Sequence, residues 1–196
     1  KGLGVSEGDR IGTLAWNGYR HFELYFAVSG TGAICHTINP RLFAEQITYI
    51  INHAKDKVIF CDLTFVPILE TIADQLSNVR AMVIMTDRAN LPETNLSNLH
   101  CYEELIRSAA DDFDWPKLNE NQASSLCYSS GTTGNPKGVV YHHRGAYLNA
   151  MSNVVSWSMA QHAAYLWTLP MFHCNGWCFP WTMAAVAGVN VCLRHV

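Results

Sequence analysis

Short apolar runs of strand length alternate with amphipathic segments of helix length, and this alternation restricts the folds that the chain can adopt. The expected strands are apolar or β-branched and are bounded by turn signals: residues 10–15, 33–37, 57–61, 81–85, 123–128 and 139–141. The expected helices repeat apolar residues three or four positions apart: residues 21–28, 43–53 and 65–76. Helices that connect successive strands place those strands parallel to one another. We therefore predict an α/β fold, a mostly parallel sheet flanked by helices.

Residues 86–121 form the longest expected connection, because they are rich in Asn, Asp, Pro and Glu. A short helix is expected within it, near residues 103–109. The connection divides the chain into a first α/β portion, residues 1–118, and a second portion, residues 119–196, which carries the motifs described below.

Composition excludes several classes of protein. The chain has 196 residues and a formal net charge of −3, so it lacks the basic field of a nucleic-acid-binding protein. Its seven cysteines are odd in number and scattered, which disfavours a secreted disulfide framework and predicts the reducing cytoplasm. The chain begins at Lys1 and ends at Val196, directly after an apolar run, so we expect a piece of a longer protein.

No Asp, Glu, Lys or Arg occurs in the 49 residues from Gly145 to Leu193, which also hold four of the six tryptophans. Because charged residues are rarely buried unpaired, the stretch predicts elements covered on both faces, part of which lines an apolar ligand cavity. A membrane span is the alternative. Its best window, residues 177–193, is short of the roughly 20 mainly apolar residues that a span needs and contains Pro180 and Gly188. We therefore predict no membrane span.

Residues 128–140 carry the strongest motif of the chain, Tyr-Ser-Ser-Gly-Thr-Thr-Gly-Asn-Pro-Lys-Gly-Val-Val. Glycines let backbone N–H groups approach an anion, hydroxyls add donors, and a lysine adds a mobile positive charge. The motif predicts a phosphate-binding loop made of Ser129, Ser130, Gly131, Thr132, Thr133, Gly134, Asn135, Pro136 and Lys137. It differs from the P-loop of nucleotide hydrolases, because Gly138 and a strand follow the lysine. A plain hairpin turn between two strands is the alternative.

This loop resembles the phosphate-binding signature of the adenylate-forming superfamily, which contains acyl-CoA synthetases, aryl-CoA ligases, luciferases and amino-acid adenylation domains. The resemblance extends upstream to the turn at residues 39–42, Asn-Pro-Arg-Leu. Downstream it reaches residues 142–145 and an expected helix with Tyr147, Met151, Val154 and Val155 on one face. It covers nearly the whole chain and implies a fragment of the large N-terminal, AMP-binding domain, without the C-terminal domain.

Residues 169–177 form the second constellation, which ends in His173, Cys174, Asn175, Gly176 and Trp177. The Cys-x3-Cys spacing of Cys174 and Cys178 allows a zinc site with His173, but no second ligand pair is suitably spaced. A lone histidine at a strand end is otherwise a hydrogen-bonded structural residue.

The same segment is similar to the acid-binding segment of medium- to long-chain fatty acyl-CoA synthetases. The resemblance implies that these five residues bind the substrate and that His173 is catalytic. It also implies that Trp177 gates the acyl tunnel. Core packing of Trp177 against Trp181 or Phe172 is the alternative.

The activity implied by the resemblance is that of an acid–thiol ligase acting on a fatty or other aliphatic acid. The carboxylate attacks the α-phosphorus of magnesium ATP, and the thiol of CoA then displaces AMP from the acyl-adenylate. Lys137 and the loop hydroxyls would hold the β- and γ-phosphates, with the Ser129 hydroxyl nearest the magnesium ion and His173 where the carboxylate and α-phosphate meet. Because the uncharged stretch has no carboxylate, the ammonium of an amino acid would lack a counter-ion.

Several superfamily motifs, including the adenine contacts and a catalytic lysine on the C-terminal domain, lie beyond Val196, so we expect the fragment alone to be inactive. Three alternatives remain: a non-catalytic ATP- or polyphosphate-binding module, a structural α/β module, and an aryl- or methylthioalkanoate-CoA ligase of the same superfamily. The expected partners are the small molecules acid, ATP and CoA, without nucleic acid. A homodimer is expected for the longer protein, because long-chain relatives often dimerise.

Overall fold

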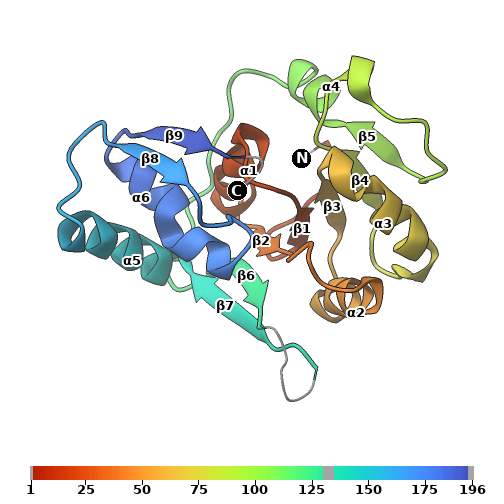
Figure 1. Ribbon diagram of the computed structural model, residues 1–196, viewed down its shortest axis with the longest axis horizontal. Coiled ribbons are helices and arrows are strands. Elements are labelled where there is room, and N and C mark those ends of the chain that lie inside the picture. The colour runs from red at the N-terminus through yellow and green to blue at the C-terminus, as the bar shows by residue number, and fades with distance from the viewer. Residues whose placement is uncertain (1, 130–134, 194–196) are drawn as a thin grey trace.

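The computed structural model describes residues 2–129 and 135–193 of the chain (Figure 1). Its strands are β1 (Arg10–Leu14), β2 (Ile34–Thr37), β3 (Val58–Cys61), β4 (Ala81–Ile84), β5 (Leu99–Cys101), β6 (Ala123–Tyr128), β7 (Gly138–His142), β8 (Ala164–Trp167) and β9 (Val189–Cys192). Within the described ranges, seven strands form one sheet in the order β5-β4-β3-β1-β2-β6-β7, and β8 and β9 form a separate parallel pair. All neighbours in the large sheet are parallel except β7, which is antiparallel to β6. The predicted mostly parallel sheet is confirmed.

Helices cover both faces of the large sheet. They are α1 (Tyr19–Gly30), α2 (Ala44–Ala54), α3 (Val66–Ile72), α4 (Tyr102–Arg107), α5 (His143–Ser156) and α6 (Phe179–Ala185). Side chains of β3 alternate between two cores, as a strand buried on both faces requires. Ile59 packs in one core with residues of α2 and α3, while Val58 packs in the other with Leu24 of α1 and Tyr102 of α4. The sheet is therefore the middle layer of three.

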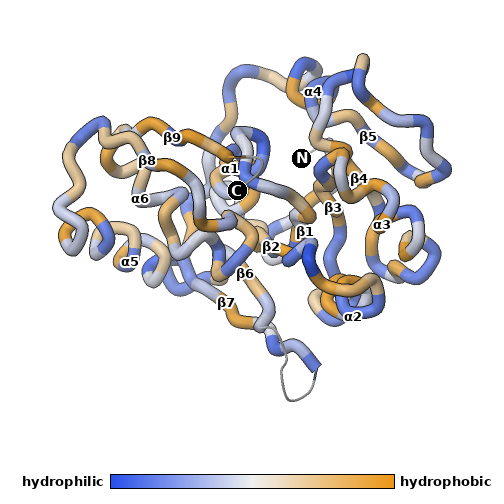
Figure 2. The backbone as a smooth tube through the Cα atoms, in the orientation of Figure 1, coloured by the Kyte–Doolittle hydropathy of each residue, from blue (hydrophilic) through white to orange (hydrophobic). Residues whose placement is uncertain are grey.

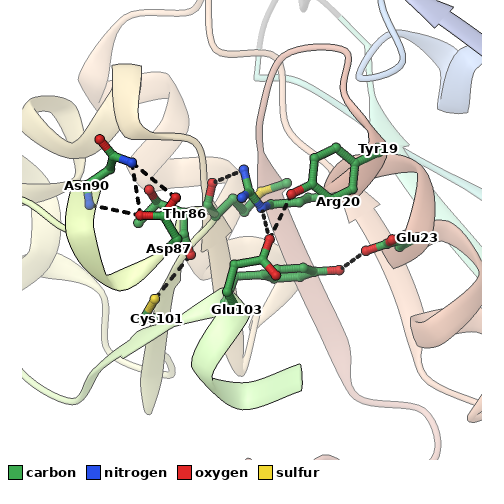
Figure 3. Close-up of polar contacts among 10 residues, drawn as sticks. Tyr19, Arg20, Glu23, Thr86, Asp87, Asn90, Cys101 and Glu103 are labelled. Atoms are coloured by element: carbon green, nitrogen blue, oxygen red, sulfur yellow. Dashed lines mark hydrogen bonds and ion pairs between the residues drawn. The ribbon is translucent and has the colours of Figure 1, made fainter. Parts of the chain in front are cut away.

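The long connection contains one strand that the sequence did not predict. Strand β5 has only three residues and pairs with β4 at the edge of the sheet. The short helix expected beside it is present as α4. Arg20 of α1 holds this region, because its Nε lies 2.7 Å from Glu103 Oε1 and its Nη1 donates to the Met85 carbonyl at 3.2 Å (Figure 3). The start of the connection and its helix α4 are therefore tied to the main fold.

The second portion of the chain continues the same sheet. Strand β6 pairs with β2 across the division at residue 119, and α5 packs against α6. Asn17, just after β1, links this portion to the first: its Nδ2 donates to the carbonyls of Trp167 and Leu169, each at 3.1 Å, and its Oδ1 accepts from Met171 N at 2.7 Å. These bonds fix the segment that leads to His173.

The prediction that the uncharged stretch is covered on both faces is wrong for this chain. Strand β9 is largely orange in Figure 2, yet one side of the β8–β9 pair and one face of α5 are exposed. The exposed apolar residues of the stretch are Tyr147, Leu148, Met151, Val155, Trp157, Leu166, Trp177, Val189 and Val191. The reason is that no element in the described ranges packs over these faces. Among the described residues, no helix is long and apolar enough to span a membrane.

Candidate active site

A cavity of about 190 Å³ lies at the carboxyl ends of β2 and β6. Segments far apart in the sequence line it: the end of β2 with the turn after it, helix α2, the end of β6 with the start of the phosphate loop, strand β7, and the segment around His173. The lining residues are Thr37, Ile38, Asn39, Leu42, Ile50, Cys127, Tyr128, Ser129, Val139, Tyr141, Phe172, His173 and Cys174. The carboxyl ends of parallel strands are where α/β sheets commonly bind ligands. The two motifs singled out in the sequence therefore meet at one cavity.

The described ends of the phosphate loop form a hairpin. Ser129 N donates to the Lys137 carbonyl at 3.0 Å, and Lys137 N donates to Ser129 Oγ at 3.1 Å. Lys137 is exposed and has no carboxylate partner among the described residues, whereas Pro136 is buried. The loop joins the antiparallel neighbours β6 and β7, and this pairing places Ser129 at the cavity.

Five predicted loop residues lie outside the described residues: Ser130, Gly131, Thr132, Thr133 and Gly134. Of the other four, Ser129 lines the cavity and Asn135 is exposed beside the buried Pro136. The four remain candidates on the strength of the motif.

Tyr128, the residue before the loop, is held by two histidines. His53 Nδ1 of α2 lies 2.7 Å from the Tyr128 hydroxyl, and the ring centroids of His36 and Tyr128 are 5.2 Å apart. Burial raises the pKa of Tyr128 to about 12, so its hydroxyl stays protonated and can donate to His53. Neither histidine belongs to a sequence motif that predicts a role for it. The one sequence feature that points to these contacts is the aromatic residue, Tyr128, directly before the phosphate motif.

The segment around His173 contains five candidate residues, of which two line the cavity, His173 and Cys174. Asn175 and Gly176 are buried behind them. Trp177 is 53% exposed, so core packing against Trp181 or Phe172 is wrong for the described chain.

Charge at the cavity favours an anionic ligand. None of the lining residues is a carboxylate. Above Phe172, Arg41 places its guanidinium carbon 5.9 Å from that ring and 5.8 Å from the ring of Trp16. A guanidinium stacked on aromatic faces keeps its N–H edge available for phosphate or carboxylate oxygens.

Neither metal nor thiol chemistry is favoured by the side chains present. No group of three His, Cys, Asp or Glu side chains in the described part of the chain could hold a metal ion, so the zinc alternative lacks a ligand set. Burial raises the pKa of the Cys127 thiol to about 11 and also raises that of Cys174, so both thiols stay protonated and weakly nucleophilic. A hydroxyl such as that of Ser129 fits Mg²⁺ only as one oxygen among phosphate and water ligands.

Comparison with known proteins agrees with this geometry. The family model for AMP-binding enzymes matches residues 1–196. The chain belongs to the AMP-binding enzyme family. It is 47% identical over 193 residues to a medium-chain-fatty-acid–CoA ligase of Ectopseudomonas oleovorans, covering 97% of this chain and 35% of that protein. It is 48% identical over 195 residues to a 3-methylmercaptopropionyl-CoA ligase of Ruegeria lacuscaerulensis, covering 97% of this chain and 36% of that protein.

A solved structure shows the same fold for this AMP-binding enzyme chain. The anthranilate CoA ligase AuaEII, in complex with anthranoyl-AMP, superposes with a TM-score of 0.87 at 24% identity, over 100% of this chain and 37% of that chain. The chain therefore spans about a third of the length of the relatives that it matches. The predicted superfamily, its acyl-CoA ligase branch and its fold are confirmed.

Proposed function

We propose that this chain is part of an ATP-dependent acid–thiol ligase that converts an aliphatic carboxylic acid into its CoA thioester. One observation carries the proposal: the start of the phosphate loop and His173 line the same cavity. The reaction needs two anions, the carboxylate and the triphosphate of ATP, to meet in a site that reduces their repulsion. A cavity without carboxylates beside Lys137 suits that requirement.

The residues have separate tasks in this proposal. Lys137, Ser129 and the loop residues between them bind the β- and γ-phosphates. The Ser129 hydroxyl would help to hold a magnesium ion, which would neutralise phosphate charge. His173 contacts the carboxylate where it attacks the α-phosphorus, and pyrophosphate leaves. The CoA thiol then attacks the acyl carbon, AMP leaves, and the thioester forms. Trp177 gates the space for the acyl chain.

Two relatives define the expected substrate class. One is named for medium-chain fatty acids and the other for 3-methylmercaptopropionate, and both names denote carboxylic acids with an uncharged tail. The cavity likewise has no carboxylate to pair the ammonium of an amino acid. We therefore favour a fatty acid, with a methylthioalkanoate as the second candidate. We further propose a cytoplasmic homodimer with a role in fatty acid metabolism.

The test uses the full-length protein with ATP, Mg²⁺, CoA and acids of increasing chain length. Thioester formation with aliphatic acids is expected, and Lys137→Ala should lower kcat/KM for ATP by about 10- to 100-fold through loss of a charge-assisted hydrogen bond. Lys117→Ala is the control, because Lys117 is an exposed lysine in the connection before β6. ATP binding without thioester formation from any acid would favour the non-catalytic module instead.

A further inference from the structure

The turn that follows His173 has a left-handed backbone over its whole length. All five residues of η4 (Cys174–Cys178) have positive φ angles, between 49° and 63°. Only Gly176 among them lacks a Cβ, so the other four adopt a conformation that L-residues avoid. Such a backbone persists only where surrounding contacts hold it, and it is found most often at functional sites.

Contacts from two other elements hold the ends of this turn. The Tyr141 hydroxyl of β7 donates to the Cys174 carbonyl at 3.3 Å. Asn153 of α5 donates from Nδ2 to the Trp177 carbonyl at 3.0 Å. Both bonds reach the backbone of the turn, so they hold its two ends and leave its middle to other contacts.

The middle of the turn is held by a side chain that enters the protein interior. Asn175 is fully buried, and its Oδ1 accepts a hydrogen bond of 3.2 Å from Thr37 Oγ1 at the end of β2. Its Nδ2 is buried and has no hydrogen-bond partner among the described residues. Next to it, Gly176 N donates to the His173 carbonyl at 2.9 Å and closes the turn on His173. Among the described residues, the hydroxyl of Thr37 is therefore the hydrogen-bond partner of the Asn175 side chain.

We infer that Thr37 and Asn175 form a positioning pair for His173, an inference that rests on the proposed function. Asn175 does not line the cavity, and the Thr37 hydroxyl that could face a ligand donates to Asn175 instead. The pair holds the left-handed turn in place, and the turn fixes the backbone of His173. Asn175 thus acts through His173 and has no contact with the acid.

Kinetics of the full-length protein test this inference. Thr37→Val has nearly the same shape and lacks the hydroxyl, and it should lower kcat for thioester formation about tenfold, because a small displacement of a reacting group has a large effect on rate. KM for ATP should stay within about twofold, since the phosphate loop is untouched. Thr37→Ser keeps the hydroxyl and should restore kcat to near the wild-type value.

A double-variant cycle separates the pair from two independent effects. Asn175→Gly keeps the left-handed backbone accessible and removes the side chain with its carboxamide, so it should match Thr37→Val. The double variant should be no slower than either single variant. The inference would be overturned if the fold-losses in kcat of the two single variants multiplied in the double variant. It would also be overturned if kcat were unchanged in Thr37→Val, or if only KM for the acid changed.

A measurement that needs no activity distinguishes this inference from the proposed function. The imidazole NMR signal of His173, assigned with His173→Gln, should shift in Thr37→Val and not in Thr37→Ser. An unshifted signal in Thr37→Val would overturn the positioning role. A wild-type protein that makes no thioester with any acid would contradict the proposed function alone.

Discussion

His36 Nδ1 lies 2.7 Å from Asp56 Oδ2, and both side chains are fully buried. The pair lies under the start of the phosphate loop, because the ring of His36 packs against that of Tyr128. Desolvation raises the pKa of Asp56, and the nearby His36 partly offsets this effect. The aromatic residue that precedes the loop therefore rests on a polar pair without access to water.

Removing one partner of this pair should destabilise the protein strongly. Asp56→Ala leaves His36 Nδ1 buried without its acceptor, and we expect the free energy of unfolding to fall by about 3 to 5 kcal/mol. Asp56→Asn keeps an acceptor oxygen and should cost less. Urea denaturation measures both, with the exposed Asp111→Ala as control. Equal small effects for all three variants would contradict the prediction.

Stability should decrease in acid because of His21. This side chain is fully buried between Thr13 Oγ1 and the Trp16 carbonyl, each 3.1 Å away, and burial lowers its pKa to about 4. In the unfolded chain a histidine binds its proton near pH 6.5. As pH falls from 7 through 6.5 toward 4, the unfolded state therefore gains a proton at His21 that the folded state does not bind. The free energy of unfolding falls as a result, by an amount that approaches roughly 3 kcal/mol near pH 4.

Urea denaturation at several pH values between 7 and 4 measures this loss. His21→Gln cannot bind the proton, so its free energy of unfolding should depend less steeply on pH than that of the wild type. Parallel pH profiles for the two proteins would show that His21 does not cause the loss.

The hydrogen bond between His53 and Tyr128 should matter for nucleotide binding. Tyr128→Phe removes the hydroxyl that lies 2.7 Å from His53 Nδ1, and the strand end that enters the loop loses its link to α2. Because one hydrogen bond contributes about 1 kcal/mol, KM for ATP should rise roughly fivefold while KM for the acid is unchanged. Tyr49→Phe is the matched control, because the Tyr49 ring also stacks on His53, with centroids 5.4 Å apart. A similar rise in both variants would count against a specific role of the Tyr128 hydroxyl.

Most of the fold could be predicted from the sequence, because most strands are runs of at least four residues that are recognisably apolar or β-branched and are bounded by turn signals. Strand β3, for example, has four apolar residues between turn signals, and the structure alternates them between two cores. Strand β5 has only three residues, of which one is a histidine, and no periodicity can appear in so short a segment. Exposure of the uncharged stretch could not be predicted either, because it depends on which elements pack over it.

The residues of the candidate site that belong to local motifs could be predicted from the sequence. Those that take part through contacts with distant residues could not. His173 and Ser129 were identified because loop chemistry has a local signature. His53, by contrast, reaches Tyr128 across 75 positions of the chain, and Thr37 reaches Asn175 across 138. A left-handed backbone at Cys174, Trp177 and Cys178 contradicts residue preferences and follows from tertiary contacts, so it could not be predicted from the sequence.

Trp177 offers a test of whether the acid-binding segment selects the acyl chain. Its ring is 53% exposed, so Trp177→Ala should change the free energy of unfolding by no more than about 0.5 kcal/mol, whereas Phe172→Ala in the buried core should cost about 3 to 5 kcal/mol. If the ring limits the space for the acid, Trp177→Ala should change the ratio of kcat/KM between a long and a short acid by about tenfold. KM for ATP should stay the same, because the phosphate loop is not altered. A stability loss as large as that of Phe172→Ala, together with an unchanged preference for chain length, would mean that Trp177 packs structurally in the full-length protein and does not select the substrate.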